Sequence, residues 1–216
     1  MTALTGRRAI VTAGPTIEPI DPVRFLSNRS SGKQGYAIAA ALAEQGAEVS
    51  LVSGPTCLPC PTGVTRIDVE SARDMLAAVE ALLPAEIFVA VAAVADWRPE
   101  TQSALKAEKS ATGTTLTLVE NPDILRTLSQ HQSLRPELVV GFAAETHDVL
   151  ERARAKRLRK GCDWIVANDV SGDAMGGDQN AVTLIRASDE TRWPRAGKQA
   201  VARKLVDEMG RHLAKV

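Results

Sequence analysis

Short apolar runs alternate along this chain with longer segments whose apolar residues recur at helical spacing. The runs predict six strands, and most are nearly continuous in apolar residues, as expected of strands that helices cover on both faces. They are Arg8–Ala13, Glu48–Ser53, Val64–Val69, Ile87–Ala95, Leu138–Ala143 and Trp164–Ala167. Strands that alternate with helices predict an α/β fold with a mainly parallel sheet.

The segments of helical spacing predict five helices: Gly35–Gln45, Ser71–Leu83, Pro122–Gln130, Asp148–Arg159 and Lys198–Leu213. Local signals mark some of their ends. Gly46 is placed to close the first helix, and Ser71 can cap the second with Asp74 three residues later. Asn121 directly before Pro122 predicts a capping residue followed by a first-turn proline.

Three irregular segments separate these elements: Gly14–Lys33, Trp97–Gly113 and Ser171–Asn180. Long loops inside a compact domain are usually functional or mobile. The first two follow predicted strands, and ligands of open parallel sheets bind beyond the carboxyl ends of the strands. These two loops are therefore the expected place for chemistry.

Composition narrows the class of protein. The chain has 216 residues without a low-complexity linker, which predicts a single domain over residues 1–216. Its 26 basic and 26 acidic residues cancel, so the net charge indicates neither nucleic acid nor a membrane as a partner. The longest apolar run, Ile87–Ala95, is too short for a membrane span, and the first residues lack a signal-peptide core. With an odd number of cysteines, three, a cytoplasmic protein is expected.

Two polar stretches resemble anion cradles. Thr12–Thr16 overlaps the end of the first predicted strand, and Ser27–Lys33 precedes the first predicted helix. Small residues let a ligand approach the backbone, hydroxyls donate to phosphate oxygens, and a helix N-terminus supplies free N–H groups. The plainer alternative is that Ser30 and Ser31 only cap the helix.

Common nucleotide motifs do not fit this chain. No G-x-G-x-x-G follows the first strand, and the second strand ends without the acidic residue that holds a nicotinamide ribose. Ser30–Lys33 lacks the leading glycine and the final hydroxyl residue of a P-loop. Tyr36 is followed four residues later by Ala40, so the tyrosine–lysine pair of short-chain dehydrogenases is missing. Hydride transfer is therefore disfavoured.

Several charged residues allow more than one interpretation. Asp96 follows small residues at the end of the fourth predicted strand, where it could accept from ribose hydroxyls, help hold a metal or only cap a turn. Lys106 and Lys109 form one lysine pair, and Lys156 and Lys160 form another. Such pairs are as often solvated as bound to a ligand.

Cysteine and histidine chemistry is weakly indicated. Cys57 and Cys60 have C-x-x-C spacing but lack the second pair of ligands that a structural zinc site requires. His131, His147 and His212 are scattered, and no G-x-S-x-G motif accompanies them. The sequence therefore assigns no residue as a metal ligand.

Seven motifs occur in order along the chain: Val11–Thr16, Asp21–Arg24, Ser27–Lys33, Ala92–Asp96, Asn121–Ile124, Gly141–Thr146 and Ala167–Ser171. Together they resemble the bacterial phosphopantothenate–cysteine ligases, from about Gly6 to the last helix. The resemblance implies an α/β, Rossmann-like three-layer fold with a mostly parallel central sheet. It also implies a small antiparallel extension that serves dimerisation.

The reaction implied by this resemblance belongs to coenzyme A biosynthesis and uses CTP and Mg²⁺. The carboxylate of 4′-phosphopantothenate attacks the α-phosphorus of CTP, which releases pyrophosphate and leaves an acyl-cytidylate. The amine of L-cysteine then displaces CMP to form 4′-phosphopantothenoyl-L-cysteine. Such chemistry depends on fixed donors and cations more than on a protein nucleophile.

The resemblance also implies roles for single residues. Asn28 is expected to hold the acyl-cytidylate and Lys106 to bind the triphosphate, and both are implied to be catalytic. Asp96 matches a carboxylate that contacts the ribose, while Lys156 and Lys160 match basic positions that face CTP. The other implied nucleotide-binding residues are Gly14, Ser30, Ala90, Val91, Ala92, Pro122, Asp123, Ile124, Leu125 and Phe142.

Some positions depart from the family pattern. Glu108 lies within the basic loop, Ile17 replaces a frequent arginine, and Glu120 replaces a frequent lysine, so phosphate affinity could be reduced. One alternative to the ligase therefore stays open: a nucleotide-binding regulatory or scaffolding module without turnover. A nicotinamide-dependent reductase would require nicotinamide binding that the second predicted strand does not support.

The resemblance also implies partners. In the family a neighbouring subunit completes the substrate site, so a homodimer is expected, with the polar segment Gly172–Asn180 as an exposed arm. The flavin-dependent decarboxylase half of the bifunctional biosynthesis protein is the other expected partner.

Overall fold

The computed structural model describes residues 4–106, 108, 113–145, 147–169 and 179–214. Eight strands of the described part form one central sheet: β1 (Arg8–Ala13), β4 (Glu48–Ser53), β5 (Val64–Asp68), β6 (Ile87–Ala90), β9 (Leu138–Glu145), β10 (Trp164–Asp169), β12 (Val182–Ile185) and β13 (Glu190–Arg192). Their order is β13-β12-β10-β9-β6-β1-β4-β5. The six strands from β10 to β5 are parallel, whereas β12 and β13 add an antiparallel edge. The predicted α/β fold is confirmed.

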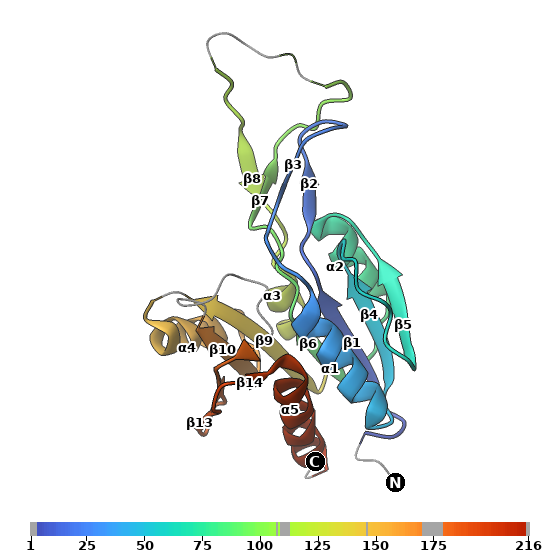
Figure 1. Cartoon of the computed structure of the whole chain (residues 1–216), viewed down its shortest axis with the longest axis vertical. Coiled ribbons are helices and arrows are strands. Elements are labelled where there is room, and N and C mark those ends of the chain that lie inside the picture. The colour runs from blue at the N-terminus through green and yellow to red at the C-terminus, as the bar shows by residue number, and fades with distance from the viewer. Residues whose placement is uncertain (1–3, 107, 109–112, 146, 170–178, 215–216) are drawn as a thin grey trace.

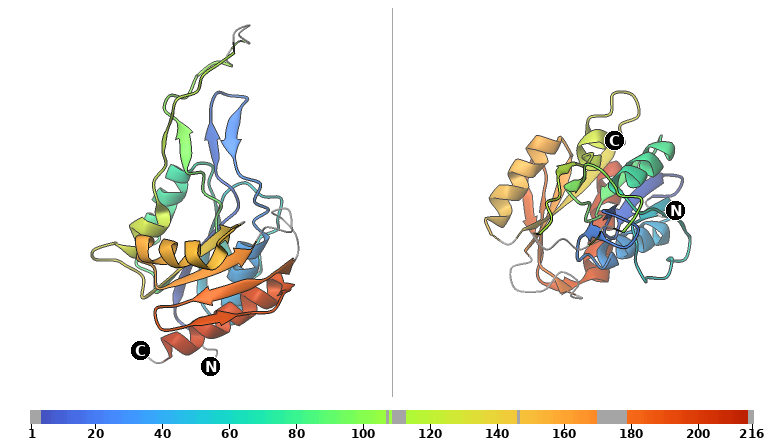
Figure 2. Two further views of the ribbon diagram at one scale, coloured as in Figure 1. Left: turned by 90° about the vertical axis from the view of Figure 1, so that its left-hand side faces the viewer. Right: turned by 90° about the horizontal axis from the view of Figure 1, so that it is seen from above.

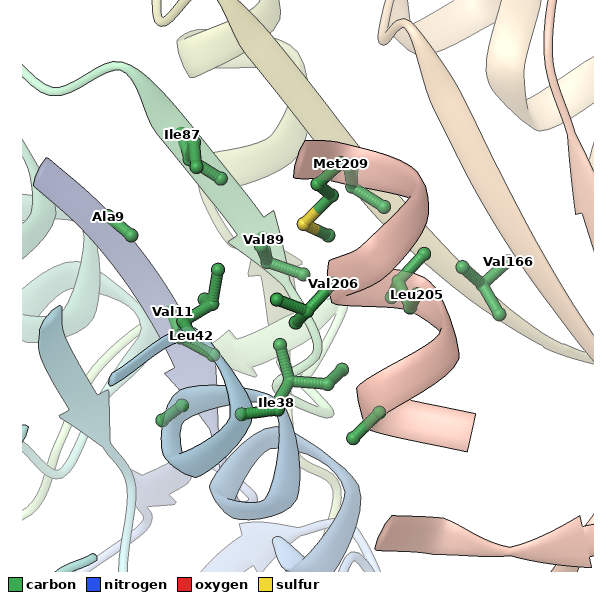
Figure 3. Packing of buried hydrophobic residues seen from close by; sticks show 14 of the residues in the cluster. Ala9, Val11, Ile38, Leu42, Ile87, Val89, Val166, Leu205, Val206 and Met209 are labelled. Atoms are coloured by element: carbon green, nitrogen blue, oxygen red, sulfur yellow. The ribbon is translucent and has the colours of Figure 1, made fainter. Parts of the chain in front are cut away.

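Helices cover both faces of this sheet and give three layers (Figures 1 and 2). On one face lie α1 (Lys33–Glu44) and α5 (Lys198–Leu213), and on the other lie α2 (Ala72–Ala81), α3 (Ile124–Ser129) and α4 (Val149–Lys160). Figure 3 shows side chains of α1 and α5, such as Leu42 and Val206, packed against Val11 and Val89 of the sheet. Each layer boundary therefore has its own apolar core.

The fourth predicted strand is shorter than expected. It ends at Ala90 as β6, and the following residues run beside the end of β1 with a single isolated bridge between Pro15 and Ala93. Val91 N–H donates to Thr12 O at 3.2 Å, and Ala93 N–H donates to Gly14 O at 2.9 Å. The apolar run continues past Ala90 because these residues form the wall of a cavity and not a strand.

Two of the three predicted helix ends are confirmed. The Ser71 side chain accepts from Asp74 N–H at 3.1 Å in a capping box, and Gly46 has φ +86° directly after the last turn of α1. The predicted cap at Asn121 is wrong. Asp123 caps α3 by accepting from Arg126 N–H at 3.1 Å, and Asn121 instead donates from Nδ2 to Ala95 O at 2.9 Å.

Three small antiparallel sheets were not located from the sequence. They pair β2 (Ile17–Pro19) with β3 (Phe25–Ser27), β7 (Trp97–Pro99) with β8 (Leu118–Glu120), and β11 (Gln179–Asn180) with β14 (Ala196–Gly197). The first two stand out beyond the carboxyl edge of the central sheet, away from both termini (Figures 1 and 2). We call the described residues of 17–27 and 97–120 the extension, and the central sheet with its five helices the body.

No helix among the described residues is both long and apolar enough to cross a membrane.

Candidate active site

A cavity of about 780 Å³ lies at the carboxyl edge of the central sheet. Its floor includes Thr12 at the end of β1, Ala90 at the end of β6 and Phe142 of β9. From β1 the chain first builds β4 and β5 on one side, then returns to build β6 on the other side. Such a reversal opens a crevice between adjacent strand ends, where α/β proteins bind their ligands.

The wall after β6 consists of small residues and is held by hydroxyl groups. Residues 90–95 all line the cavity, and Asp96 follows at its mouth with an exposed side chain. Thr12 Oγ1 accepts from Ala92 N–H at 3.4 Å, and Thr16 Oγ1 accepts from Ala95 N–H at 2.9 Å. A flat ligand such as a nucleobase can lie along this wall because no large side chain stands in its way.

The wall on the α4 side carries two lysines. Lys156 donates from Nζ to Phe142 O at 2.8 Å, and Lys160 forms an ion pair with Asp123, the cap of α3. Burial lowers the pKa of Lys156, and the nearby charge of Lys160 lowers it further. An anion in the cavity would favour the charged form of Lys156 and so oppose this shift.

The facing wall is the start of α1. Ser30, Ser31, Gly32 and Lys33 line the cavity, and Gly32 begins the helix with φ +74° and no side-chain cap. Ser30 Oγ accepts from Gly32 N–H at 3.3 Å, so the plain helix-capping alternative does not describe this segment. A Cβ on Gly32 would lie 2.8 Å from Thr56 Cγ2, so this position requires glycine for packing as well as for its φ.

All of the implied nucleotide-binding residues except Gly14 and Lys106 line this cavity. Gly14 lies behind the wall, where its carbonyl accepts from Ala93 N–H and a Cβ would meet Gly54 O at 2.9 Å. Asn28 is beside the wall and donates from Nδ2 to Ala93 O at 2.9 Å. Lys106 is exposed in the extension between β7 and β8.

Sequence reasoning missed a group of polar side chains at the other end of the cavity: Gln34, Gln179, Asn180, Arg195 and Lys198. One signal could have pointed to them. Lys198 begins α5 and Lys33 begins α1, and neither helix has an acidic residue in its first turn. Lysine at a helix N-terminus opposes the helix dipole, so two such residues suggest a bound anion.

Asn168 of β10, which belongs to the seventh motif, also lines the cavity. Its Oδ1 is buried and finds no hydrogen-bond partner among the described residues. A buried acceptor of this kind is costly unless a donor reaches it. Asn168 can therefore accept a hydrogen bond from a ligand.

The remaining candidate groups lie apart from this cavity. Within the described part of the chain, no group of three His, Cys, Asp or Glu side chains is placed to hold a metal ion. Cys57 and Cys60 are exposed free thiols, and burial raises the pKa of the Cys162 thiol to about 11. None of these three cysteines lines the cavity.

Comparison with known proteins shows the family of this chain. The family model for the DNA/pantothenate metabolism flavoprotein C-terminal domain matches residues 4–213. The chain is 48% identical over 204 residues to the Coenzyme A biosynthesis bifunctional protein CoaBC of Vibrio cholerae. This alignment covers 92% of this chain and 51% of that protein. It is also 48% identical over 206 residues to that of Escherichia coli, with coverage of 93% and 50%. The chain thus spans about half the length of the curated relatives it matches.

Solved structures show the same fold. The crystal structure of the C-terminal domain of Coenzyme A biosynthesis bifunctional protein CoaBC aligns over the whole of both chains, with a TM-score of 0.84 and 40% identity. A mutant of Cab2 in complex with phosphopantothenate-cysteine aligns with a TM-score of 0.76 and 15% identity, over 97% of this chain and 89% of that chain. This chain belongs to the family of the DNA/pantothenate metabolism flavoprotein C-terminal domain.

Proposed function

We propose that this chain is a CTP-dependent phosphopantothenate–cysteine ligase of coenzyme A biosynthesis. One observation carries the proposal: a single cavity at the carboxyl edge gathers the small-residue wall, Asp96 and the α4 lysines, as a nucleotide site requires. The names of the relatives and the motifs along the chain support the same reaction.

In this proposal the nucleotide lies across the strand ends. The cytosine lies along residues 90–92, where the wall is flat, and the carboxylate of Asp96 accepts from the ribose hydroxyls. The start of α1 and Ser30 donate to phosphate oxygens, and Lys156 and Lys160 add positive charge from α4. Lys106 reaches the triphosphate from the extension.

Magnesium fits this cavity as a companion of the triphosphate. Mg²⁺ usually keeps several waters and binds through one or two carboxylates plus substrate phosphates. Asp96, Glu120 and Asp123 are carboxylates of the cavity wall, and Lys160 already pairs with Asp123. With Asp96 on the ribose, Glu120 would therefore hold the ion, whose charge would offset that of the phosphates.

The two steps place different demands on the protein. When the substrate carboxylate attacks the α-phosphorus, cations of the cavity stabilise the pyrophosphate that leaves. When cysteine attacks the acyl-cytidylate, the intermediate must stay in place. Asn28 meets this second demand, since its amide both donates and accepts and is anchored to the wall through Ala93 O.

The proposal is tested by following pyrophosphate release in the presence of 4′-phosphopantothenate, L-cysteine and Mg²⁺. We expect release and amide formation with CTP, and much slower release with ATP. Equal rates with the two nucleotides would contradict base-selective binding. CTP binding without any turnover would instead favour the regulatory or scaffolding alternative.

We further propose that the chain acts as a homodimer through the extension. Val23, Phe25, Trp97 and Leu118 lie in its two hairpins with 60%, 54%, 49% and 41% of their surface exposed. Isolated two-stranded hairpins are marginally stable, and clustered exposed apolar side chains mark interaction surfaces. In the arm expected to dimerise, residues 172–178 lie outside the described part, while Gln179 and Asn180 form β11.

Light scattering of a variant tests this assembly. Phe25→Ser should weaken the dimer by about 1–2 kcal/mol or more, because an interface aromatic is lost. Leu158→Ser is the matched control, since Leu158 is 72% exposed on α4, away from the extension. A fully active wild-type monomer would refute the dimer.

We also propose the flavin-dependent decarboxylase as a second partner of this chain, because the relatives are bifunctional.

A further inference from the structure

We propose that Arg195 and Lys198 form a second phosphate subsite in the cavity, separate from the lysines of α4; this proposal rests on the ligase function above. The two residues reach the cavity from the face of the sheet that α1 and α5 cover, whereas Lys156 and Lys160 come from the opposite face. The cavity thus has positive charge at both ends.

The two side chains are held by a short sheet between them. Ala196 and Gly197 form β14, which pairs with Asn180 and Gln179 of β11. Arg195 lies on one side of this strand and donates from Nε to Gln179 Oε1 at 3.1 Å. Lys198 lies on the other side as the first residue of α5. Both cations are therefore fixed to the same paired segment.

A buried glutamine ties this segment to α1. Gln34 accepts at Oε1 from Asn180 Nδ2 at 2.9 Å and donates from Nε2 to Lys198 O at 3.2 Å. Gln34 lies in the first turn of α1 and is 9% exposed. Its amide thereby sets the distance between Lys198 and the Ser30–Gly32 cradle before any ligand binds, which favours tight binding.

The charge of the cavity selects the ligand. Lys33, Lys156, Lys160, Arg195 and Lys198 line it together with three carboxylates, although the whole chain has no net charge. Arginine and lysine together bind phosphate well, because the guanidinium donates in a planar fork and the ammonium acts as a point charge. A phosphate group therefore fits this end, either from the triphosphate of CTP or from the phosphomonoester of the acid substrate.

Two variants test the subsite in separate assays. Arg195→Gln and Lys198→Gln each remove one charge while keeping most of the side-chain length. Calorimetric titration with CTP and Mg²⁺, without acid substrate, measures how much each residue contributes to binding of the triphosphate. The KM for 4′-phosphopantothenate at saturating CTP reports how much each residue contributes to binding of the phosphomonoester. We expect each variant to lose about 10- to 100-fold in one of these assays, the usual loss for a charged hydrogen bond.

Arg203→Gln is the matched control. Arg203 lies on the same helix but is exposed, pairs with Glu44 at 3.6 Å, and does not line the cavity. Loss of CTP affinity assigns the subsite to the triphosphate, and a raised KM with normal CTP affinity assigns it to the phosphomonoester. If both variants match Arg203→Gln in both assays, the subsite is overturned. Absence of turnover in the wild type would instead refute the ligase function itself.

The two single variants also guard against a folding defect. Urea unfolding shows whether either one has lost its structure, and the variant that stays folded then decides. If both are destabilised, Lys198→Met, which keeps the length of the side chain without its charge, replaces them in the same two assays, and unchanged CTP affinity together with an unchanged KM overturns the subsite.

Discussion

The body and the extension hold their functional side chains in opposite ways. In the body, Lys156 is half-buried and hydrogen-bonded to the backbone of β9, within a wall built from strand ends. In the extension, whose two hairpins project from the body (Figure 1), Lys106 is exposed in the connection between β7 and β8. We therefore propose a division of labour, in which the body recognises the nucleotide and the extension supplies a lysine and the surface that joins two subunits.

Asn28 lies where the two regions meet. It directly follows β3, and Ser27 Oγ donates to Thr16 O at 2.8 Å to close the base of the hairpin. Glu18 of β2 is buried and accepts from Ala72 N–H at the start of α2, which fastens the extension to the body. The residue expected to hold the intermediate is therefore anchored to both regions.

The largest expected effect comes from Asn28→Asp. The change replaces a donor with a negative charge near phosphate, so the overall rate should fall by about 100-fold or more, or about 3 kcal/mol. Coupled assay of amide formation measures it. Gln102→Glu adds the same charge to an exposed residue of the extension and should change the rate little. A comparable loss in both variants would show a charge effect and remove Asn28 from the site.

Substitutions in the body should lower the free energy of unfolding far more than substitutions in the extension. A Cβ on Gly141 would lie 2.6 Å from Leu125 Cδ2 and 2.8 Å from Ile165 Cδ1, so Gly141→Ala should lower the free energy of unfolding by about 1–3 kcal/mol. Val23→Ser on the exposed hairpin should change it by less than about 0.5 kcal/mol at low protein concentration. Urea titration of both variants checks this, and a reversed order would contradict the comparison.

Lys106→Ala removes a cation from the extension. The variant should need about tenfold more CTP, and pyrophosphate release without cysteine should fall below that of Asn28→Asp, because its defect precedes the intermediate. Single-turnover assays with labelled CTP separate the two. Arg159→Ala, an exposed change on α4, is the control. If Lys106→Ala releases pyrophosphate at the wild-type rate, the extension does not contribute to the reaction of CTP, and residues of the body alone account for it.

The smallest expected effect concerns protonation of Lys156. Since burial places its pKa below the ordinary 10.5, part of Lys156 is neutral in alkaline solution, and bound phosphate favours the charged form. CTP binding should therefore take up protons there, and affinity should fall as the pH rises through the lowered pKa. Calorimetry in two buffers of different ionisation enthalpy measures the uptake. Lys156→Met should reduce it, and unchanged uptake would point to another group.

The regular elements of the body could be predicted because their signals are local. Apolar runs predicted both ends of β1 and β4 correctly, and amphipathic spacing predicted both ends of α5. The hairpins of the extension were not predicted, because strands such as β3 and β8, with three largely exposed residues each, are too short to show apolar alternation. The end of β6 escaped because an apolar run does not distinguish a strand from a cavity wall.

The residues of the site also differ in how far the sequence could predict them. Asp96 and the α4 lysines stood out as candidates but had equally plain alternatives until the cavity placed them together. Arg195 and Lys198 were missed because Gln34 and Asn180, which position them, are 146 residues apart, and a lysine at the start of a helix is by itself a weak signal. Contacts over such separations depend on the completed sheet, and single-sequence periodicity does not report them.

The acyl-cytidylate is the most direct test of the central claim. Purified protein is mixed with Mg²⁺, labelled CTP and 4′-phosphopantothenate, without cysteine, and the products are separated. We predict stoichiometric pyrophosphate together with a bound acyl-cytidylate that cysteine converts to the amide and CMP. Absence of this intermediate, with cysteine ligation still proceeding, would contradict the mechanism, and absence of both products would contradict the function.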